Sequence, residues 1–173
     1  MRTKFSKFTL FMLLAGALTA LRGLLERSLP EVLLLASFIL LLSAAGRKDL
    51  RDGKLPGRFA GAALLLGILG LPFFPDLSFG LRLQGSLAVS LPLFLICLVR
   101  PGAFGGGDVK LMAGCGFFLG TEAVLPAFAA AAVLAGVRAV FLLLRGKAGR
   151  KDRFPFGPFL CAGMALMLML GFP

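Results

Sequence analysis

Residues 105–110 read Gly105-Gly106-Gly107-Asp108-Val109-Lys110, and they separate two long apolar runs of the chain. The aspartate and the lysine stand at the start of the second run. Ionisable groups near or within a bilayer are costly, so their presence there indicates a functional site. The glycines before them allow turns that other residues resist and let another backbone approach closely. This stretch therefore predicts a membrane protein with a functional site at the mouth of a helix.

The composition is that of an integral membrane protein. Of the 173 residues, 58% are hydrophobic, above the roughly 45–50% of a soluble domain, and the mean hydropathy is +0.94. The chain contains no His, Trp or Tyr, which excludes a histidine triad, a histidine metal site and a haem histidine. Its three cysteines, Cys97, Cys115 and Cys161, lie far apart in apolar runs and form no CxxC pair. We therefore interpret them as small buried hydrophobes and predict no metal site.

Seven apolar segments follow one another along the chain. They cover residues 8–25, 30–45, 59–75, 83–99, 109–120, 122–144 and 155–172. A complete span needs about 20 residues, so the second and fifth segments are short. The fifth is either a half-length helix or one that begins below the membrane surface. Because lipid offers no partner to open backbone groups, and no alternating strand pattern is present, we predict an all-α bundle of six to seven transmembrane or half-membrane helices.

The distribution of Lys and Arg predicts the orientation. Basic clusters precede the first segment and lie between segments two and three, around the glycine run, and between segments six and seven. The opposite loops hold only Arg22, Arg27 and Arg82. The positive-inside rule therefore predicts a multi-pass protein of the cell inner (cytoplasmic) membrane with a cytoplasmic N-terminus. The same clusters explain the net charge of +11 as loop charge beside lipid headgroups, so the expected partner is the bilayer and not a nucleic acid.

The length predicts a single domain. We expect one membrane-embedded domain over residues 1–173, with residues 1–29 as an N-terminal anchor helix. A cleaved signal peptide is the alternative for the first segment, although Leu18-Thr19-Ala20 is a poor cleavage site. The spacing of Gly116 and Gly120 predicts close helix packing, and the oligomeric state is not predicted.

Three of the eight carboxylates are left on the predicted cytoplasmic side once loop and helix-end charges are set aside: Asp49, Asp52 and Asp108. If the second segment continues through Asp49, that carboxylate lies at a helix C-terminus, where the dipole disfavours it. Asp108 starts the fifth segment on the same side, so two carboxylates can meet across a bundle.

The alternative is that each of these aspartates pairs with a neighbouring cation. Lys48 or Arg51 would then neutralise Asp49, and Lys110 would neutralise Asp108.

Two close carboxylates have a hydrolytic mechanism available. They cannot both ionise easily, so one holds a proton while the other stays charged. The charged one takes a proton from a water molecule that attacks a peptide carbonyl, and the protonated one polarises that carbonyl and helps the amine leave. This chemistry needs neither a metal nor a cofactor, so we expect none.

Three patches of the chain resemble the motifs of one family. Residues 49–56 read Asp-Leu-Arg-Asp-Gly-Lys-Leu-Pro, residues 105–111 read Gly-Gly-Gly-Asp-Val-Lys-Leu, and residues 154–159 read Phe-Pro-Phe-Gly-Pro-Phe. They resemble the Asp-Leu-Arg-x-x-x-Ile/Leu-Pro, Gly-x-Gly-Asp-x-Lys-Leu and Pro-Phe-Gly-Pro-Phe motifs of the type IV prepilin peptidases, which are GxGD-type membrane aspartic proteases. The resemblance covers about residues 30–170. In that family the first catalytic aspartate lies seven residues before the proline, which selects Asp49 over Asp52, and Asp108 is the second.

The resemblance implies an aspartic endopeptidase that cleaves the leader peptide of type IV prepilins or pseudopilins after a glycine at the cytoplasmic membrane face, in type IV pilus assembly or protein secretion. We expect Gly105, Gly106, Gly107 and Lys110 to bind the substrate, because a glycine run lets an extended backbone approach Asp108. Bifunctional members carry an N-terminal region with paired CxxC motifs linked to N-methylation. This chain has none, so we expect the short, peptidase-only form without methyltransferase activity.

Two departures and three alternatives remain. Gly57 stands where the family usually has Asn or Asp after the proline, and the first segment lies outside the resemblance.

A small proton-coupled transporter or channel component is one alternative, because intramembrane acids also relay protons. It predicts an internal repeat or deep charges, and the only deep candidate, Arg138, can snorkel. A lipoprotein signal peptidase lacks its Gly-Asn-x-x-Asp-Arg pattern here, and a non-catalytic assembly factor would not need both aspartates.

Overall fold

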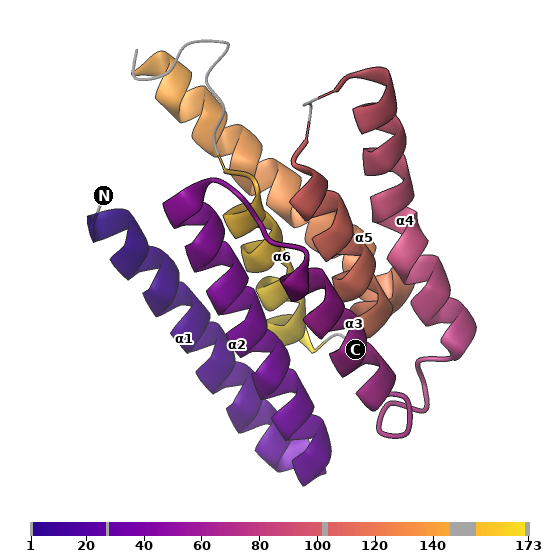
Figure 1. Cartoon of the computed structure of the whole chain (residues 1–173). Helices are drawn as coiled ribbons and strands as arrows, with labels where there is room; N and C mark the ends of the chain where they lie inside the picture. The colour runs from indigo at the N-terminus through magenta and orange to yellow at the C-terminus, as the bar shows by residue number, and fades with distance from the viewer. Residues whose placement is uncertain (1, 27, 102–103, 146–154, 172–173) are drawn as a thin grey trace.

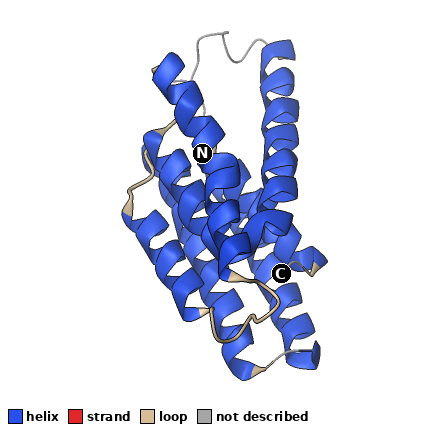
Figure 2. Ribbon diagram, turned by 90° about the vertical axis from the view of Figure 1, so that its right-hand side faces the viewer, coloured by secondary structure: helices blue, strands red, loops and turns tan. Residues whose placement is uncertain are grey.

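The structure is a computed structural model that describes residues 2–26, 28–101, 104–145 and 155–171. Within these ranges the chain forms helices and no strand (Figures 1 and 2). The helices are α1 (Arg2–Glu26), α2 (Leu29–Asp52), α3 (Arg58–Leu69), α4 (Phe79–Val99), α5 (Gly106–Leu144) and α6 (Gly157–Leu170). The prediction of an all-α bundle of six to seven helices is confirmed.

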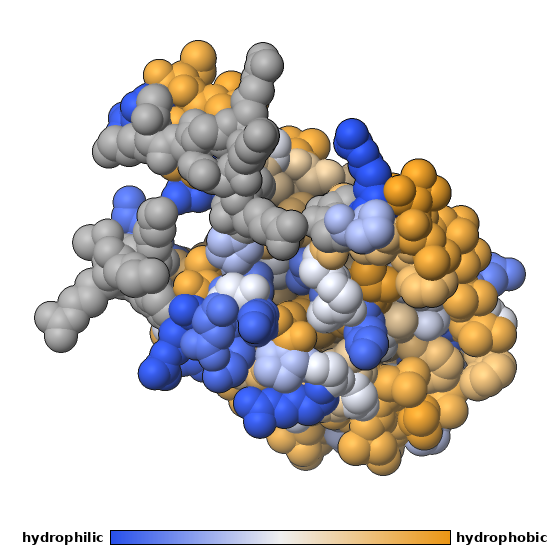
Figure 3. Space-filling view, turned by 45° about the horizontal axis from the view of Figure 1, so that its top comes forward, coloured by the Kyte–Doolittle hydropathy of each residue, from blue (hydrophilic) through white to orange (hydrophobic). Residues whose placement is uncertain are grey.

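Helix length and surface composition identify a multi-pass membrane protein. Among the described residues, α2, α4 and α5 are long and apolar enough to cross a membrane, and α3 and α6 are shorter apolar helices. Large apolar side chains such as Leu40 and Val137 are 65% exposed, which suits a surface solvated by lipid. Figure 3 looks onto the upper end of Figure 1 and shows hydrophilic side chains gathered there, with hydrophobic ones around them.

The predicted fifth and sixth segments join into one broken helix, α5. Gly120 interrupts it with φ 75° and ψ 176°, a conformation that is essentially restricted to glycine. The part before the break, residues 106–119, is about 21 Å long at 1.5 Å per residue, less than the roughly 30 Å of a hydrocarbon core. The first part of α5 is therefore of half-membrane length, and it also begins below the upper end of α4 (Figure 1), so the two descriptions offered for the fifth segment are compatible.

The predicted second segment was too short, because α2 continues to Asp52. Helix α3 begins below the upper end of α2, and α5 begins below the upper end of α4 (Figure 1). The connections between these helices therefore descend into the bundle, and they bring the start of α5 beside the last turns of α2.

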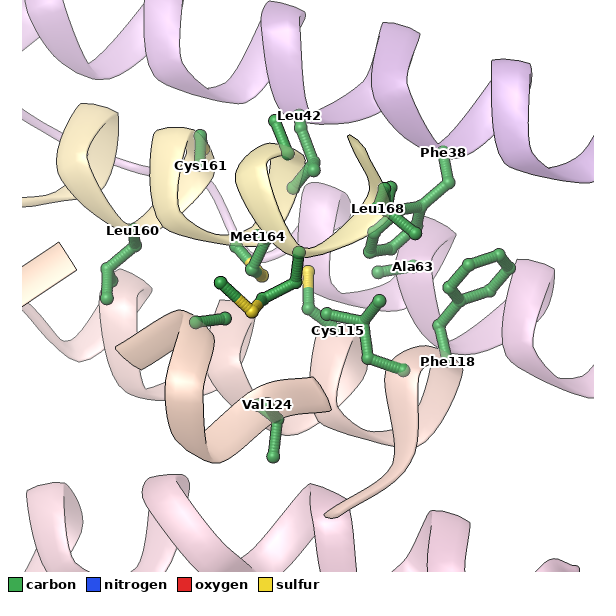
Figure 4. Close-up of a cluster of buried hydrophobic side chains, with 14 of the residues drawn as sticks. Phe38, Leu42, Ala63, Cys115, Phe118, Val124, Leu160, Cys161, Met164 and Leu168 are labelled. Carbon is green, nitrogen blue, oxygen red and sulfur yellow. The ribbon is translucent and has the colours of Figure 1, made fainter. Parts of the chain in front are cut away.

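Helix α5 is the centre of the bundle and packs against α3, α4 and α6, while α1 packs on α2 and α6. At the α4–α5 crossing, a methyl group on Gly85 would lie 2.5 Å from the Gly116 carbonyl oxygen. The predicted packing role of Gly116 is thus observed. The core also holds a stacked pair, Phe38 of α2 and Phe118 of α5, with ring centroids 4.1 Å apart (Figure 4).

Two of the three cysteines are completely buried in this core, Cys115 on α5 and Cys161 on α6. Figure 4 shows them among apolar side chains that include Met164 and Leu42. Cys97 is only partly buried. The interpretation of Cys115 and Cys161 as buried hydrophobes agrees with these positions.

Arg82 contradicts its reading as an outer-loop charge, because it is fully buried in the first turn of α4. Its guanidinium donates to the carbonyl oxygens of Leu77 at 3.1 Å, Gly67 and Gly70 at 3.2 Å each, and Phe117 at 3.4 Å. Gly67 and Gly70 lie at the C-terminal end of α3, where the helix dipole favours a cation. These hydrogen bonds fasten the C-terminal end of α3 and the middle of α5 to the start of α4.

Candidate active site

Asp49 is fixed by the end of α2. Gly53 adopts φ 62° and donates its N–H to the Asp49 carbonyl oxygen at 2.8 Å, which closes the helix with a left-handed cap. Asp49 therefore lies in the last turn, and its side chain points inward, with the residue only 5% exposed. A carboxylate at this helix end is unfavourable to the dipole, so another group has to stabilise it.

Asp108 is fixed by the start of α5. Its backbone N–H donates to the Gly105 carbonyl oxygen at 2.9 Å, which sets the first turn. The residue is 7% exposed, and its carboxylate folds back over Gly105, where an added Cβ would lie 3.0 Å from Oδ2. A side chain at position 105 would therefore displace the carboxylate.

Gly157, at the start of α6, joins the two aspartates. Its N–H donates to Asp49 Oδ2 at 3.1 Å. A Cβ added to Gly157 would lie 2.7 Å from Asp49 Oδ2 and 3.3 Å from Asp108 Oδ1. Because both distances start from the same point, the distance between Asp49 Oδ2 and Asp108 Oδ1 cannot exceed their sum. The structure thus brings together the two aspartates predicted to be catalytic, from positions far apart in the sequence.

Neither aspartate takes the alternative partners considered from the sequence. Lys48 Nζ lies 2.5 Å from Asp52 Oδ2, and Arg51 Nε lies 3.7 Å from Asp52 Oδ1. Within the part of the chain that the structure describes, no ion pair involves Asp49 or Asp108. Lys48 and Arg51 instead pair with Asp52, which lies at the surface.

One oxygen of the pair has no hydrogen-bond partner. Asp108 Oδ1 is the single buried side-chain polar atom without one among the described residues. An unpaired buried acceptor costs about 1–3 kcal/mol, so its persistence needs an explanation such as a catalytic role. The atom faces Asp49 across Gly157, which places the unmet acceptor inside the candidate site.

The predicted substrate-binding residues separate into different environments. A Cβ on Gly107 would collide with the Leu55 carbonyl oxygen, so Gly107 packs against the α2–α3 connection. A Cβ on Gly106 would meet no atom within 4 Å. The exposed Lys110 side chain passes Gly57, with its Cδ 3.9 Å from where a Cβ would be. Of the three glycines, only Gly105 lies against a carboxylate, that of Asp108. Substrate binding by Gly105, Gly106, Gly107 and Lys110 stays a prediction.

Two features of the site were missed by the sequence analysis. The first is the role of Gly157 itself, whose only signal was its place in the third matched motif. The second is an aromatic cluster that flanks the site, with ring centroids 5.8 Å apart for Phe104 and Phe156 and 6.4 Å apart for Phe128 and Phe156. It holds the residues before α5, the second part of α5 and the start of α6 together.

The arrangement offers general acid–base chemistry by two carboxylates. No group of three or more His, Cys, Asp or Glu side chains suited to a metal ion occurs in the described ranges. Two buried carboxylates that converge on one glycine supply the acid and the base that peptide hydrolysis requires.

Comparisons with known proteins find a family of peptidases. The sequence model of the type IV leader peptidase family matches residues 33–140. The prepilin leader peptidase/N-methyltransferase of Bacillus subtilis is 30% identical over an alignment of 141 residues that covers 78% of this chain. That of Burkholderia pseudomallei is 33% identical over an alignment of 175 residues that covers 97% of this chain. The leader peptidase HopD of Escherichia coli is 34% identical over an alignment of 146 residues that covers 80% of this chain and 91% of its own length.

The relatives differ in how much of them this chain covers. It spans 54% of the Bacillus protein and 56% of the Burkholderia protein, about half the length of each. No solved structure matches the chain with statistical significance.

Proposed function

Because this chain belongs to the type IV leader peptidase family, we propose that it is a membrane aspartic endopeptidase that removes the leader of type IV prepilins or pseudopilins by cutting after a glycine. The relatives are named as prepilin leader peptidases, which supports a peptidase acting on this class of substrate. The convergence of the Asp49 and Asp108 carboxylates on Gly157 carries the aspartic mechanism.

The mechanism uses the two carboxylates in turn. One, ionised, takes a proton from a water molecule as its oxygen attacks the carbonyl carbon of the scissile peptide. The other, protonated, gives its proton to the carbonyl oxygen, and the amine then leaves with a proton. Burial of both side chains strengthens these interactions, because a low-dielectric site screens charge less than water does.

The position of the site supports cleavage close to a membrane surface. Helix α5, which carries Asp108 in its first turn, begins below the upper end of α4 (Figure 1). We place that end in the cytoplasm, because the exposed basic residues Arg47 and Arg51 lie on it. The leader of a substrate would then approach from the cytoplasm while its hydrophobic helix stays in the inner membrane.

The peptidase step is the only one that we assign to these residues. The relatives from Bacillus and Burkholderia carry N-methyltransferase in their names, and within the 173 residues no CxxC pair is present. Buried Arg82 gives no support to the transporter alternative, because backbone carbonyls satisfy it.

The test is cleavage of a prepilin-like peptide by the purified full chain in detergent, with product masses read by mass spectrometry. We expect one cut, after the glycine at the end of the leader, and no cut when both Asp49 and Asp108 are replaced by Asn. A well-folded wild-type chain that leaves several pilin leaders intact would contradict the proposal.

A further inference from the structure

We propose that the two aspartates hold fixed and different roles, with Asp49 as the ionised base and Asp108 as the protonated acid, and that Gly157 is the positioning residue that sets the difference. This inference rests on the proposed function and assigns the chemistry within the same site. It is carried by the different hydrogen-bond environments of the two carboxylates.

The first step is the donor that faces Asp49. The Phe156 carbonyl accepts the N–H groups of Phe159 at 3.0 Å and Leu160 at 3.2 Å, which closes the first turn of α6. Pro158 has no N–H, so Gly157 carries the N–H that is left to point out of this turn. That N–H reaches Asp49 Oδ2, and the positive end of the α6 dipole lies behind it. Both effects favour negative charge on Asp49.

The second step is the unpaired oxygen atom of Asp108. This residue also lies in the first turn of a helix, and the Gly105 backbone forms a hydrogen bond with its carboxylate, on which Oδ2 lies nearest to Gly105. Its other oxygen, Oδ1, faces Gly157 and Asp49, is buried and receives no hydrogen bond. A proton on Oδ1 removes the unmet acceptor and supplies a donor to the neighbouring carboxylate. The proton therefore belongs on Asp108.

The third step is the charge around the pair. On α2, Lys48 and Asp52 neutralise each other, and the Arg51 side chain is 79% exposed. The buried thiol that interacts with the pair is that of Cys161, one turn after Gly157, and the Cys115 thiol on α5 interacts in turn with Cys161. Among the described residues, no cation is paired with either aspartate, so none cancels the difference that the Gly157 N–H makes between Asp49 and Asp108.

The resulting cycle is balanced. Asp49 accepts a proton from water while the water oxygen bonds to the carbonyl carbon, and Asp108 donates its proton to the carbonyl oxygen. When the C–N bond breaks, the leaving amine takes the proton that Asp49 holds, and a hydroxyl group of the tetrahedral intermediate returns a proton to Asp108 as the carboxyl product forms. Asp49 is then ionised again and Asp108 protonated, with one water consumed.

The test compares Asp49→Asn with Asp108→Asn in the full-length chain in detergent. Asn is neutral and can donate a hydrogen bond, so it imitates a protonated aspartate but cannot replace an ionised one. We expect Asp108→Asn to retain at least about 10-fold more activity than Asp49→Asn, and to lose the alkaline fall of the wild-type pH profile. Equal residual activity, or the reverse order, would overturn the assignment.

A second variant tests Gly157 directly. Gly157→Ala would place a methyl group against both carboxylates, so we expect kcat to fall about 100-fold with little change in KM. The acidic limb of the pH profile should move to higher pH, because Asp49 loses its donor. Gly136→Ala, where a Cβ meets no atom within 4 Å, is the matched control. An unshifted acidic limb in a folded, active Gly157→Ala chain would contradict the positioning role.

These outcomes separate the two proposals. If the wild-type chain cleaves its substrate but the two Asn variants behave alike, the assignment of roles fails and the peptidase function stands. If wild type cleaves no pilin leader, the function fails, and the assignment fails with it. The comparison of Asn variants also remains decisive if Gly157→Ala does not fold.

Discussion

The Gly157 backbone N–H donates to the carboxylate of Asp49 across 108 positions of the sequence, with N and Oδ2 3.1 Å apart. This bond joins the last turn of α2 to the first turn of α6. The C-terminal end of α2 disfavours the negative charge of Asp49, and the N-terminal end of α6 stabilises that charge. Asp108 of α5 also lies next to Gly157. The site is therefore formed by residues of three helices, α2, α5 and α6.

Cleavage should depend on pH in a bell shape. One carboxylate must be ionised and the other protonated, so activity falls when acid protonates the first and when base ionises the second. The rate of peptide cleavage in detergent across the range in which the fold is stable checks this. A rate that rises steadily with pH, without an alkaline fall, would contradict an acid–base pair.

Gly107→Ala should destabilise the chain, and Gly106→Ala should not. A methyl group at position 107 collides with the Leu55 carbonyl oxygen, whereas position 106 is open. We expect a loss of about 1–3 kcal/mol for the first and less than about 0.5 kcal/mol for the second. Thermal unfolding followed by circular dichroism measures both, since the chain has no Trp or Tyr.

The same Gly106→Ala variant tests substrate binding. Because its fold should be intact, a raised KM for the peptide would support a contact between substrate and the glycine run. An unchanged KM would remove Gly106 from the set of predicted substrate-binding residues.

Gly120→Ala should lower stability by about 1–3 kcal/mol, because its backbone conformation is strained for any side chain. An added Cβ would also lie 3.1 Å from the Leu77 side chain. Gly136→Ala in the same helix should be neutral or stabilising by up to about 1 kcal/mol. Equal unfolding temperatures for the two variants would show that the break in α5 does not need glycine.

Arg82→Met should prevent stable folding, because it leaves buried carbonyl groups of α3 and α5 without a donor. Each such group costs about 1–3 kcal/mol. Arg82→Lys should rescue little, since one ammonium cannot reproduce the planar fork of a guanidinium. The yield of monodisperse protein in detergent measures this, and a normal yield of Arg82→Met would contradict the role given to Arg82.

The helices and the two aspartates could be predicted, because composition and motifs indicate them. Contacts between residues far apart in the sequence could not be predicted, because they depend on how the helices pack. Hydropathy predicted the helices, and matched motifs selected Asp49 and Asp108. The burial of Arg82 could not be seen, because its partners are backbone carbonyls that carry no sequence signal. Gly157 was visible as part of a motif, but its contact with both carboxylates depends on how α6 packs against α2 and α5.

The boundaries show the same limit. Apolarity ends before Asp49, so the second segment was predicted to stop at residue 45, although polar residues continue α2 to Asp52. Likewise, the sequence predicted two segments separated by a short gap. Hydropathy could not show that one glycine, Gly120, makes the break and that helical residues follow directly on both sides of it.

The most direct measurement is the cleavage rate of a prepilin-like peptide by the purified chain and by three variants, Asp49→Asn, Asp108→Asn and Asp52→Asn. Asp52 is the matched control, since it lies on the same helix but pairs with Lys48 on the surface. We predict that Asp52→Asn cleaves at close to the wild-type rate, while each of the other two loses at least about 100-fold. Processing at the wild-type rate by Asp49→Asn or Asp108→Asn, at equal amounts of folded protein, would contradict the dyad.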